Sequence, residues 1–231
     1  MNLLAFDTST ETLSIAVQRG AAPPLVHEGA GGAQASASLI PTIQGLLERA
    51  GLRLQELDAI VFGRGPGSFT GLRTACSVAQ GLAFGAGTPV LPIDTLLAVA
   101  EEARAAAGFE RVVAVLDARM DEVYSAAYVY DNASWRQEGD FALGPPESVG
   151  VPAGWAMAGN AFAAYGDRLP AGGPRAVALP TAAALLRLAP ALMAAGLAVP
   201  AAQALPLYIR DKVAQTTAER AAIRAVQAQR P

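Results

Sequence analysis

The chain has few residues of the types that bind metals or form disulfides. Its 231 residues include one cysteine, Cys76, and one histidine, His27. A disulfide needs two cysteines, and a structural or catalytic zinc site usually takes two or more ligands from cysteine and histidine. The sequence therefore excludes an internal disulfide and predicts no metal site. We expect His27 to lie on the surface, at the end of a strand.

Charged residues are also scarce. They make up 16% of the chain, and the formal net charge of −3 gives no reason to expect direct nucleic-acid binding. Two stretches, 74–93 and 188–209, carry no charge. Each is long enough to cross a bilayer, but both are alanine-rich and broken by proline and glycine, which is typical of buried elements in a soluble protein. No basic segment precedes Asp7, so we predict no signal peptide, no membrane contact and a cytoplasmic location.

Glycine, in contrast, is concentrated in one place. Residues 63–73 contain four glycines and Pro66, between an apolar run over 59–62 and a helical pattern that begins at Leu72. Backbone N–H groups in such a loop can converge on an anion or on a partner chain. Leu72 follows the last glycine where a P-loop has Lys-Ser or Lys-Thr, and the glycine spacing does not fit the dinucleotide fingerprint. The pattern leaves a structural turn and a binding loop equally open.

A strand–aspartate–turn–strand pattern occurs twice in the chain. Residues 3–17 contain it with Asp7 at the turn, and residues 112–128 repeat it with Asp117 at the same place. Two such hairpins in register predict a duplicated α/β domain. Further strands are predicted over 57–62 and 89–94, and helices over 35–50, 72–84, 95–107 and 181–195, the last interrupted near Pro190. We expect domains at 1–108 and 109–205, followed by a C-terminal segment with a basic tail at 206–231.

The helix predicted over 72–84 is apolar nearly all round, which indicates burial on two sides. Packing on the chain's own sheet is the simpler interpretation, and a partner subunit would account for the second side. We predict that one apolar patch on this helix and the helix over 35–50 docks a partner, and that Ala79→Glu breaks the pairing but leaves the chain folded. The patch consists of Leu39, Ile43, Leu46, Ala75, Val78, Ala79 and Leu82.

Four motifs together resemble the TsaD/TsaB family of tRNA threonylcarbamoyladenosine biosynthesis proteins, within the ASKHA superfamily. They are residues 7–10 (DTST), 62–73 (FGRGPGSFTGLR), 117–124 (DARMDEVY) and 206–210 (PLYIR). The resemblance runs from residue 1 to about residue 213. It implies two duplicated ribonuclease-H-like domains of the actin, Hsp70 and sugar kinase type, with mixed sheets flanked by helices.

The resemblance to TsaB-like members also implies partners, one of which carries the catalytic activity. It implies a non-catalytic subunit that binds and activates the transferase paralogue TsaD together with the ATPase TsaE, forms homodimers, and meets tRNA indirectly through the complex. TsaD carries two metal-binding histidines at positions that align with Thr95 and Val99 here, so no catalytic residue is assigned. The chain is expected to require no cofactor of its own, with ATP or ADP and Mg²⁺ left open for the assembled complex. The candidate nucleotide-binding residues, at or near the subunit junction, are Asp7, Thr8, Ser9, Gly65 and Gly67.

Two other functions stay open at this point. A self-sufficient ASKHA-fold ATP-binding enzyme, such as a kinase, ATPase or transferase, would need a second glycine loop, for which 158–160 is the candidate. A peptidase would need a nucleophile with a base, or metal ligands, and one cysteine with one histidine gives no convincing set.

Overall fold

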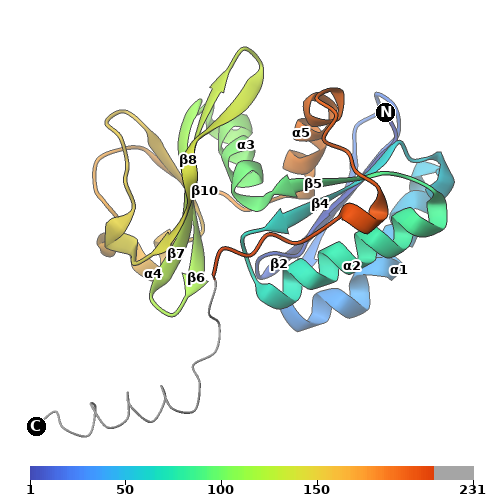
Figure 1. The fold of residues 1–231 in the computed structure, drawn as a ribbon, viewed down its shortest axis with the longest axis horizontal. Helices are drawn as coiled ribbons and strands as arrows, with labels where there is room; N and C mark the ends of the chain where they lie inside the picture. Colours follow the sequence, from blue (N-terminus) through green and yellow to red (C-terminus); the bar gives the residue numbers. More distant parts are fainter. Residues whose placement is uncertain (211–231) are drawn as a thin grey trace, which may run out of the picture.

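The computed structural model describes residues 1–210 and shows two lobes, each built on one five-stranded sheet (Figure 1). The first lobe has the sheet order β3-β2-β1-β4-β5 and the second β10-β9-β6-β7-β8. The first sheet consists of β1 (Leu3–Asp7), β2 (Thr12–Gln18), β3 (Leu25–Ala30), β4 (Ala59–Gly65) and β5 (Val90–Asp94). The second consists of β6 (Arg111–Arg119), β7 (Glu122–Asp131), β8 (Ser134–Gly144), β9 (Ala156–Gly159) and β10 (Arg175–Val177).

The two sheets repeat one topology. In the first, β1 pairs antiparallel with β2 and parallel with β4, and in the second β6 pairs antiparallel with β7 and parallel with β9. The remaining neighbours, β2–β3 and β7–β8, are antiparallel, whereas β4–β5 and β9–β10 are parallel. The predicted fold of two duplicated α/β domains with mixed sheets is therefore confirmed.

Helices cover both faces of the first sheet. On one face lie α1 (Ala35–Ala50) and α2 (Phe69–Ala86), side by side in Figure 1. On the other face lies α5 (Ala182–Ala194), whose Leu185 and Ala189 pack against Leu3 and Val61. The backbone N–H of Ala182 donates to Ser14 Oγ on β2 at 2.9 Å, which fixes the start of α5 on this sheet. Because both faces are covered, β2 is buried on both sides and does not show the half-exposed alternation of a surface strand.

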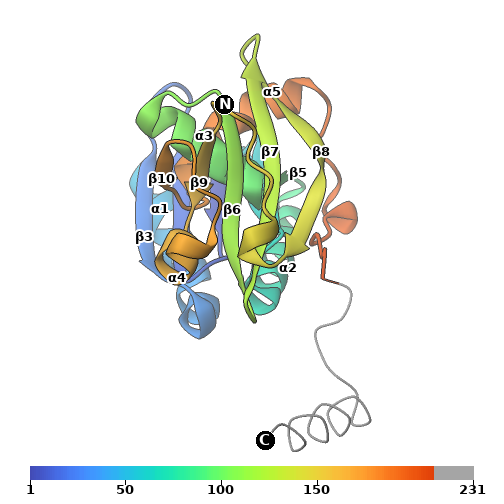
Figure 2. The ribbon, with the colours of Figure 1, turned by 90° about the vertical axis from the view of Figure 1, so that its left-hand side faces the viewer.

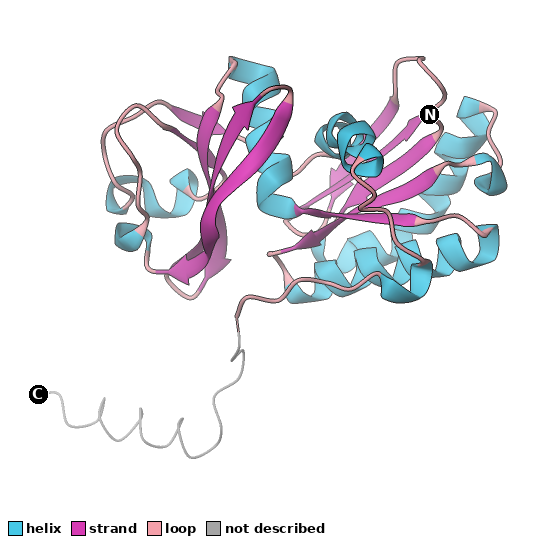
Figure 3. Ribbon diagram, turned by 45° about the horizontal axis from the view of Figure 1, so that its top comes forward, coloured by secondary structure: helices cyan, strands magenta, loops and turns pink. Residues whose placement is uncertain are grey.

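Helix α3 (Thr95–Ala107) lies between the two sheets (Figure 3). Its Leu96 and Val99 pack against β6 and β7 of the second lobe, and Ala98 faces the first sheet with α5. The far face of the second sheet carries the short helix α4 (Phe162–Tyr165), which lies in front of that sheet in Figure 2. The two lobes are thus joined through the layer that α3 forms.

The structure corrects two details of the sequence-based expectations. Helix α2 begins at Phe69, not Leu72, because Ser68 serves as its N-cap and accepts a hydrogen bond from Gly71 N–H. Helix α5 continues through Pro190 without a break, since the exposed Pro190 sits near the C-terminal end of the helix.

The expected domain limits at 108 and 205 stay predictions. Helix α5 belongs to the second half of the sequence and packs on the first lobe. Residues 211–231, which include most of the predicted basic tail, lie outside the described residues. Within residues 1–210, no helix is both long and apolar enough to cross a membrane.

Candidate functional site

A cleft of about 1130 Å³ separates the two lobes. From the first lobe it is lined by the turn after β1, by the N-terminal end of α2 and by its side chains Phe69 and Arg73. From the second lobe it is lined by Asp117 and the turn that follows β6, and by Asn160 and α4. Residues 207–210 close one end of the cleft. Both aspartate-bearing hairpins therefore meet at this cleft.

The glycine-rich loop (residues 63–71) encloses another part of the same chain. Thr8 Oγ1 donates to the carbonyl oxygen of Gly71 at 2.7 Å, and Ser68 N–H donates to the carbonyl oxygen of Ser9 at 2.8 Å. A Cβ atom on Gly71 would overlap the carbonyl oxygen of Thr8, and one on Gly63 would overlap the Asp7 carboxylate. The glycines are therefore required because residues 7–9 approach the loop too closely for a side chain.

Some of the loop's backbone N–H groups also bond within the chain. Gly65 N–H donates to Thr95 Oγ1 at 3.1 Å, and Leu72 N–H donates to the carbonyl oxygen of Ser68 at 2.8 Å. A phosphate cradle needs free N–H groups directed at the anion and space above the glycines. The N–H groups of Gly65 and Leu72 bond within the chain, and packing against residues 7–9 accounts for the glycine requirement. Anion binding by the rest of the loop stays a prediction.

The five predicted nucleotide-binding residues divide into two groups. Ser9 and Gly67 line the cleft, whereas Asp7, Thr8 and Gly65 are buried behind it. A Cβ atom on Gly67 would lie 2.7 Å from Ser9, and one on Gly65 would lie 2.6 Å from the carbonyl oxygen of Leu207. The structure thus brings the five residues together as a packed unit, and nucleotide binding by them stays a prediction.

Asp7 is the most strongly perturbed of these residues. Its Oδ1 accepts hydrogen bonds from Ser9 N–H at 2.8 Å and Ser9 Oγ at 2.6 Å, while Oδ2 is buried without a hydrogen-bond partner among the described residues. Burial raises the pKa of Asp7 from 3.8 to about 6, against the opposing effect of the two bonds from Ser9. Asp7 therefore forms the turn through its bonds with Ser9, and its burial makes ionisation of the carboxyl unfavourable in the folded chain.

The second lobe repeats this arrangement around Asp117. Its Oδ1 accepts hydrogen bonds from Arg119 N–H at 2.7 Å and from the Tyr165 hydroxyl at 2.9 Å, and its N–H donates to Asn160 Oδ1 at 2.9 Å. A Cβ atom on Gly159 would overlap the carbonyl oxygen of Val115. The candidate second glycine loop over 158–160 is therefore also filled by the chain's own backbone.

Thr95 and Val99, the two positions that the resemblance noted above aligns with metal-binding histidines, are buried. Thr95 accepts the hydrogen bond from Gly65 N–H, and Val99 packs in the core between α3 and β6. Both side chains are fully inaccessible to solvent. Within residues 1–210, no group of three or more His, Cys, Asp or Glu side chains is arranged to hold a metal ion.

Cysteine and histidine lie in unrelated environments. Cys76 is buried on α2, where its Sγ donates to the carbonyl oxygen of Ala204 at 3.3 Å. His27 is exposed within β3, at the edge of the first sheet, and not at the end of the strand. These two residues therefore do not form a nucleophile–base pair.

The predicted docking patch needs correction. Five of its seven side chains are buried in the first lobe's own core, at 2% exposure or less, namely Leu39, Ile43, Leu46, Ala75 and Ala79. Only Val78 and Leu82 are partly exposed. The buried five cannot contact a partner while the chain is folded, because they form the side of each helix that faces the sheet. A charge at Ala79 would disrupt this core, so Ala79→Glu does not test docking separately from folding.

The outer side of the same helices carries exposed apolar and small residues among polar ones such as Gln44 and Ser77. Ile40 on α1 is 41% exposed and Phe84 on α2 is 86% exposed. Gly81 and Gly85 lie on either side of Phe84 in the sequence of α2. A Cβ atom at either glycine would meet no other atom within 4 Å. Exposed small and apolar residues at these positions permit another helix to approach closely.

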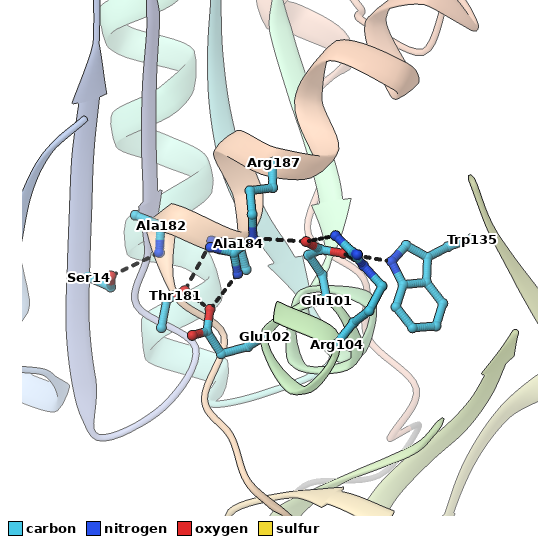
Figure 4. Close-up of polar contacts among 9 residues, drawn as sticks. All are labelled: Ser14, Glu101, Glu102, Arg104, Trp135, Thr181, Ala182, Ala184 and Arg187. Carbon is cyan, nitrogen blue, oxygen red and sulfur yellow. Dashed lines mark hydrogen bonds and ion pairs between the residues drawn. The ribbon is translucent and has the colours of Figure 1, made fainter. Parts of the chain in front are cut away.

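A buried carboxylate fixes the lobes relative to one another (Figure 4). Glu101 on α3 accepts hydrogen bonds from Arg104 Nε at 2.9 Å, from Arg187 Nε on α5 at 2.8 Å and from Trp135 Nε1 on β8 at 2.9 Å. Burial raises the pKa of Glu101, but the hydrogen bonds from these three side chains outweigh it, so the pKa is lowered. Nothing in the sequence pattern marked Glu101, because its partners come from elements far apart in the chain.

Comparison with known proteins places these observations in a family. The family model described as "TsaD: tRNA N6-adenosine threonylcarbamoyltransferase" matches residues 18–216. The chain is 35% identical to the tRNA threonylcarbamoyladenosine biosynthesis protein TsaB of Escherichia coli, over 93% of this chain and 96% of that protein. It is similar to the solved structure of YeaZ from Pseudomonas aeruginosa, with a TM-score of 0.83, 43% identity, and coverage of 90% of this chain and 99% of that one. It is also 36% identical to a tRNA N6-adenosine threonylcarbamoyltransferase of Ignicoccus hospitalis, over 42% of this chain and 30% of that enzyme.

Proposed function

The chain belongs to the TsaB family, and from that membership we propose that it is a non-catalytic partner subunit of the complex that makes threonylcarbamoyladenosine in tRNA. Its role in threonylcarbamoyladenosine biosynthesis follows from the family. The finer proposal is that it binds and activates the transferase subunit TsaD, together with TsaE, and acts in the cytoplasm. Its contact with tRNA is then indirect, through the complex.

The observation that carries the proposal is the burial of Thr95 and Val99, the positions aligned with the metal-binding histidines of TsaD. Thr95 holds the glycine-rich loop through Gly65 N–H, and Val99 is core. Both side chains are buried in the packed interior and cannot contact a substrate. Under this proposal the chain needs no cofactor of its own, and any ATP or ADP with Mg²⁺ binds in the assembled complex.

The outer side of α1 and α2 is the surface that we assign to docking. It presents Ile40, Gly81, Phe84 and Gly85, and the partly exposed Val78 and Leu82 extend it toward the groove between the helices. A helix pair of the paralogue, or of a second copy of this chain, would cover this surface and account for its apolar character.

The docking surface is tested with a charge that the folded chain tolerates. Gly81→Glu adds a side chain whose Cβ atom meets no other atom within 4 Å, so the variant should fold. It should lose TsaD binding by at least about tenfold, because the carboxylate would be desolvated against an apolar surface. Ala105→Glu, at an exposed position of α3, is the matched control and should bind as the unmodified chain does. Equal binding by both variants would place the interface elsewhere.

The function itself is tested by reconstitution. Threonylcarbamoyl incorporation into tRNA is measured with TsaC, TsaD and TsaE, each component and this chain being withheld in turn. Signal that requires both this chain and TsaD supports a partner subunit. Signal that persists without TsaD would instead show a self-sufficient enzyme and overturn the proposal.

A further inference from the structure

Residues 204–210 form a strap that passes from α2 to the second lobe, and this strap is drawn in red in Figure 1. At its start, the carbonyl oxygen of Ala204 accepts hydrogen bonds from Gln80 Nε2 at 2.7 Å and Cys76 Sγ at 3.3 Å, both on α2. In its middle, Leu207 N–H donates to the carbonyl oxygen of Arg64 at 2.7 Å. The carbonyl group of Leu207 lies in the space that Gly65 leaves open. The strap is thus attached to both the docking helix and the glycine-rich loop.

An aromatic contact adds to this attachment. The ring of Tyr208 lies 5.3 Å from the ring of Phe69, and the guanidinium carbon of Arg73 lies 3.9 Å from the centre of the Phe69 ring. Arg73 Nε also donates to the Tyr208 hydroxyl at 3.1 Å. Tyr208 therefore stacks on the first turn of α2, through contacts made with the first lobe.

The strap ends in a contact with a strained turn of the second lobe. Three consecutive residues at the end of β6 and in the turn that follows it, Arg119, Met120 and Asp121, have φ values of 60°, 56° and 61°. Left-handed backbone in residues other than glycine is unfavourable and persists only where the surroundings hold it. Arg210 supplies such support on both sides of the turn, because its Nη2 donates to the carbonyl oxygen of Ala118 at 3.1 Å and to Glu122 Oε2 at 2.6 Å.

A second contact joins the lobes across the cleft but is much more exposed. Arg119 pairs with Glu11, whose side chain is 82% exposed, whereas the Arg210 side chain is only 14% exposed. Solvent screens exposed ion pairs, so the Arg210 contact is the stronger of the two. Of these two contacts, the one made by the strap therefore holds the turn more firmly.

We propose that residues 204–210 act as a clasp that couples α2 to the strained turn and so sets the position of that turn at the cleft between the lobes. A shift of α2, the helix that carries the proposed docking surface, is transmitted along the clasp to residues 118–122. The relevance of this coupling to complex formation rests on the proposed function. The clasp itself is a property of the isolated chain and is tested there.

Hydrogen–deuterium exchange of the full chain without any partner tests the clasp. Tyr208→Ala removes contacts with Phe69 and Arg73 in the first lobe. We nevertheless expect it to speed exchange in residues 118–122 by about tenfold, because the clasp is then less firmly attached to α2. Arg210→Ala should speed exchange in the same turn and also in residues 64–73. Arg175→Ala is the matched control, since Arg175 donates to three backbone carbonyls within the second lobe, and it should leave both segments unchanged.

Two results would overturn the inference. One is a change confined to the lobe in which each substitution lies, which would make the contacts merely local. The other is an equal change in the Arg175→Ala control. If Arg210→Ala fails to fold, Tyr208→Ala alone tests the clasp. Tyr208 makes no hydrogen bond to residues 118–122, so faster exchange there can only arise through the clasp. If the exchange results contradict the clasp but TsaD still binds, the proposed function is unaffected. If TsaD does not bind but the exchange results are as expected, the clasp is unaffected.

Discussion

Individual residues show why the glycine-rich loop could be recognised from the sequence but not interpreted. The concentration of glycine in residues 63–71 predicted close backbone approach, and the structure confirms it. Residues 7–9 of the same chain approach the loop and account for its glycines. A glycine requirement is the same whether the nearby atoms belong to a phosphate or to a neighbouring strand, so only the three-dimensional structure could distinguish them.

Substitution of Gly71 tests this interpretation. A Cβ atom at Gly71 overlaps the carbonyl oxygen of Thr8, so Gly71→Ala should lower the free energy of unfolding by about 3 kcal/mol. Gly81→Ala, in the same helix but in open space, should raise it by about 0.5–1 kcal/mol because alanine favours helix. Urea denaturation of both variants gives the comparison, and a similar stability for the two would refute the steric account.

Asp7 provides a prediction about pH. Its pKa is raised from 3.8 to about 6 in the folded chain, so the protonated carboxyl favours folding, and this contribution is lost as the pH rises through about 6. Asp7→Asn keeps an acceptor for Ser9 and cannot ionise. The free energy of unfolding of Asp7→Asn, relative to the unmodified chain, should therefore rise by about 2 kcal/mol between about pH 4 and pH 7.

The Asp7 prediction is measured by denaturation of both proteins at matched pH values. Groups that titrate identically in the two proteins cancel in the difference. A difference that stays flat across this range would mean that the carboxyl of Asp7 is not desolvated.

Among the helices and strands, the sequence predicted which segments would be helical better than what each helix packs against. The helices over 35–50 and 95–107 have the expected limits. The apolar side of α1, with Leu39 and Ile43, was assigned to a partner but faces the chain's own sheet. Periodicity identifies an apolar side, and it contains no information on whether a sheet of the same chain or another subunit covers that side.

Contacts between distant elements were invisible to sequence analysis for a related reason. Glu101, Trp135 and Arg187 belong to α3, β8 and α5, and no local pattern links them. The strap was recognised as a motif over 206–210, but its contacts with α2 and with the turn after β6 depend on the arrangement of the two lobes.

The Glu101 cluster can be tested as a joint between three elements. Glu101→Gln leaves Arg104 and Arg187 without their buried counterion and should lower the free energy of unfolding by about 3 kcal/mol near pH 7. Because the pKa of Glu101 is lowered in the folded chain, the stability that it adds is present above its unfolded value of 4.5 and is lost as the pH falls through the folded value. The deficit of the variant should therefore shrink in acid.

Glu102→Gln is the control for this cluster. Glu102 lies next in the sequence and also contacts Arg187, but its side chain is 28% exposed, against 3% for Glu101. Chemical denaturation should show a clearly smaller loss for Glu102→Gln. Equal losses would mean that the burial of Glu101 is not what makes it important.

For the molecule as a whole, the two halves of the sequence are not independent bodies. Helix α5, from the second half, covers the face of the first sheet that contains Leu3 and Val61. Helix α3, from the first half, supplies Leu96 and Val99 to the core of the second lobe. A fragment of residues 1–108 would expose both apolar surfaces to water.

We therefore expect fragment 1–108 to lack a cooperative unfolding transition, whereas the full chain unfolds in a single transition. Differential scanning calorimetry of the fragment and the full chain provides the measurement. Dye binding to exposed apolar surface should be strong for the fragment alone. A fragment that unfolds cooperatively with native-like stability would contradict this dependence between halves.

The placement of α3 and α5 also has an evolutionary consequence. Both helices follow the last strand of their own half, β5 and β10, and each packs on the sheet of the other half. An ancestral single-half protein with this arrangement could bury its sheet only by exchanging that helix with a second copy of itself. Fusion of two such copies into one chain would have turned a concentration-dependent association into an intramolecular one and left each half free to diverge.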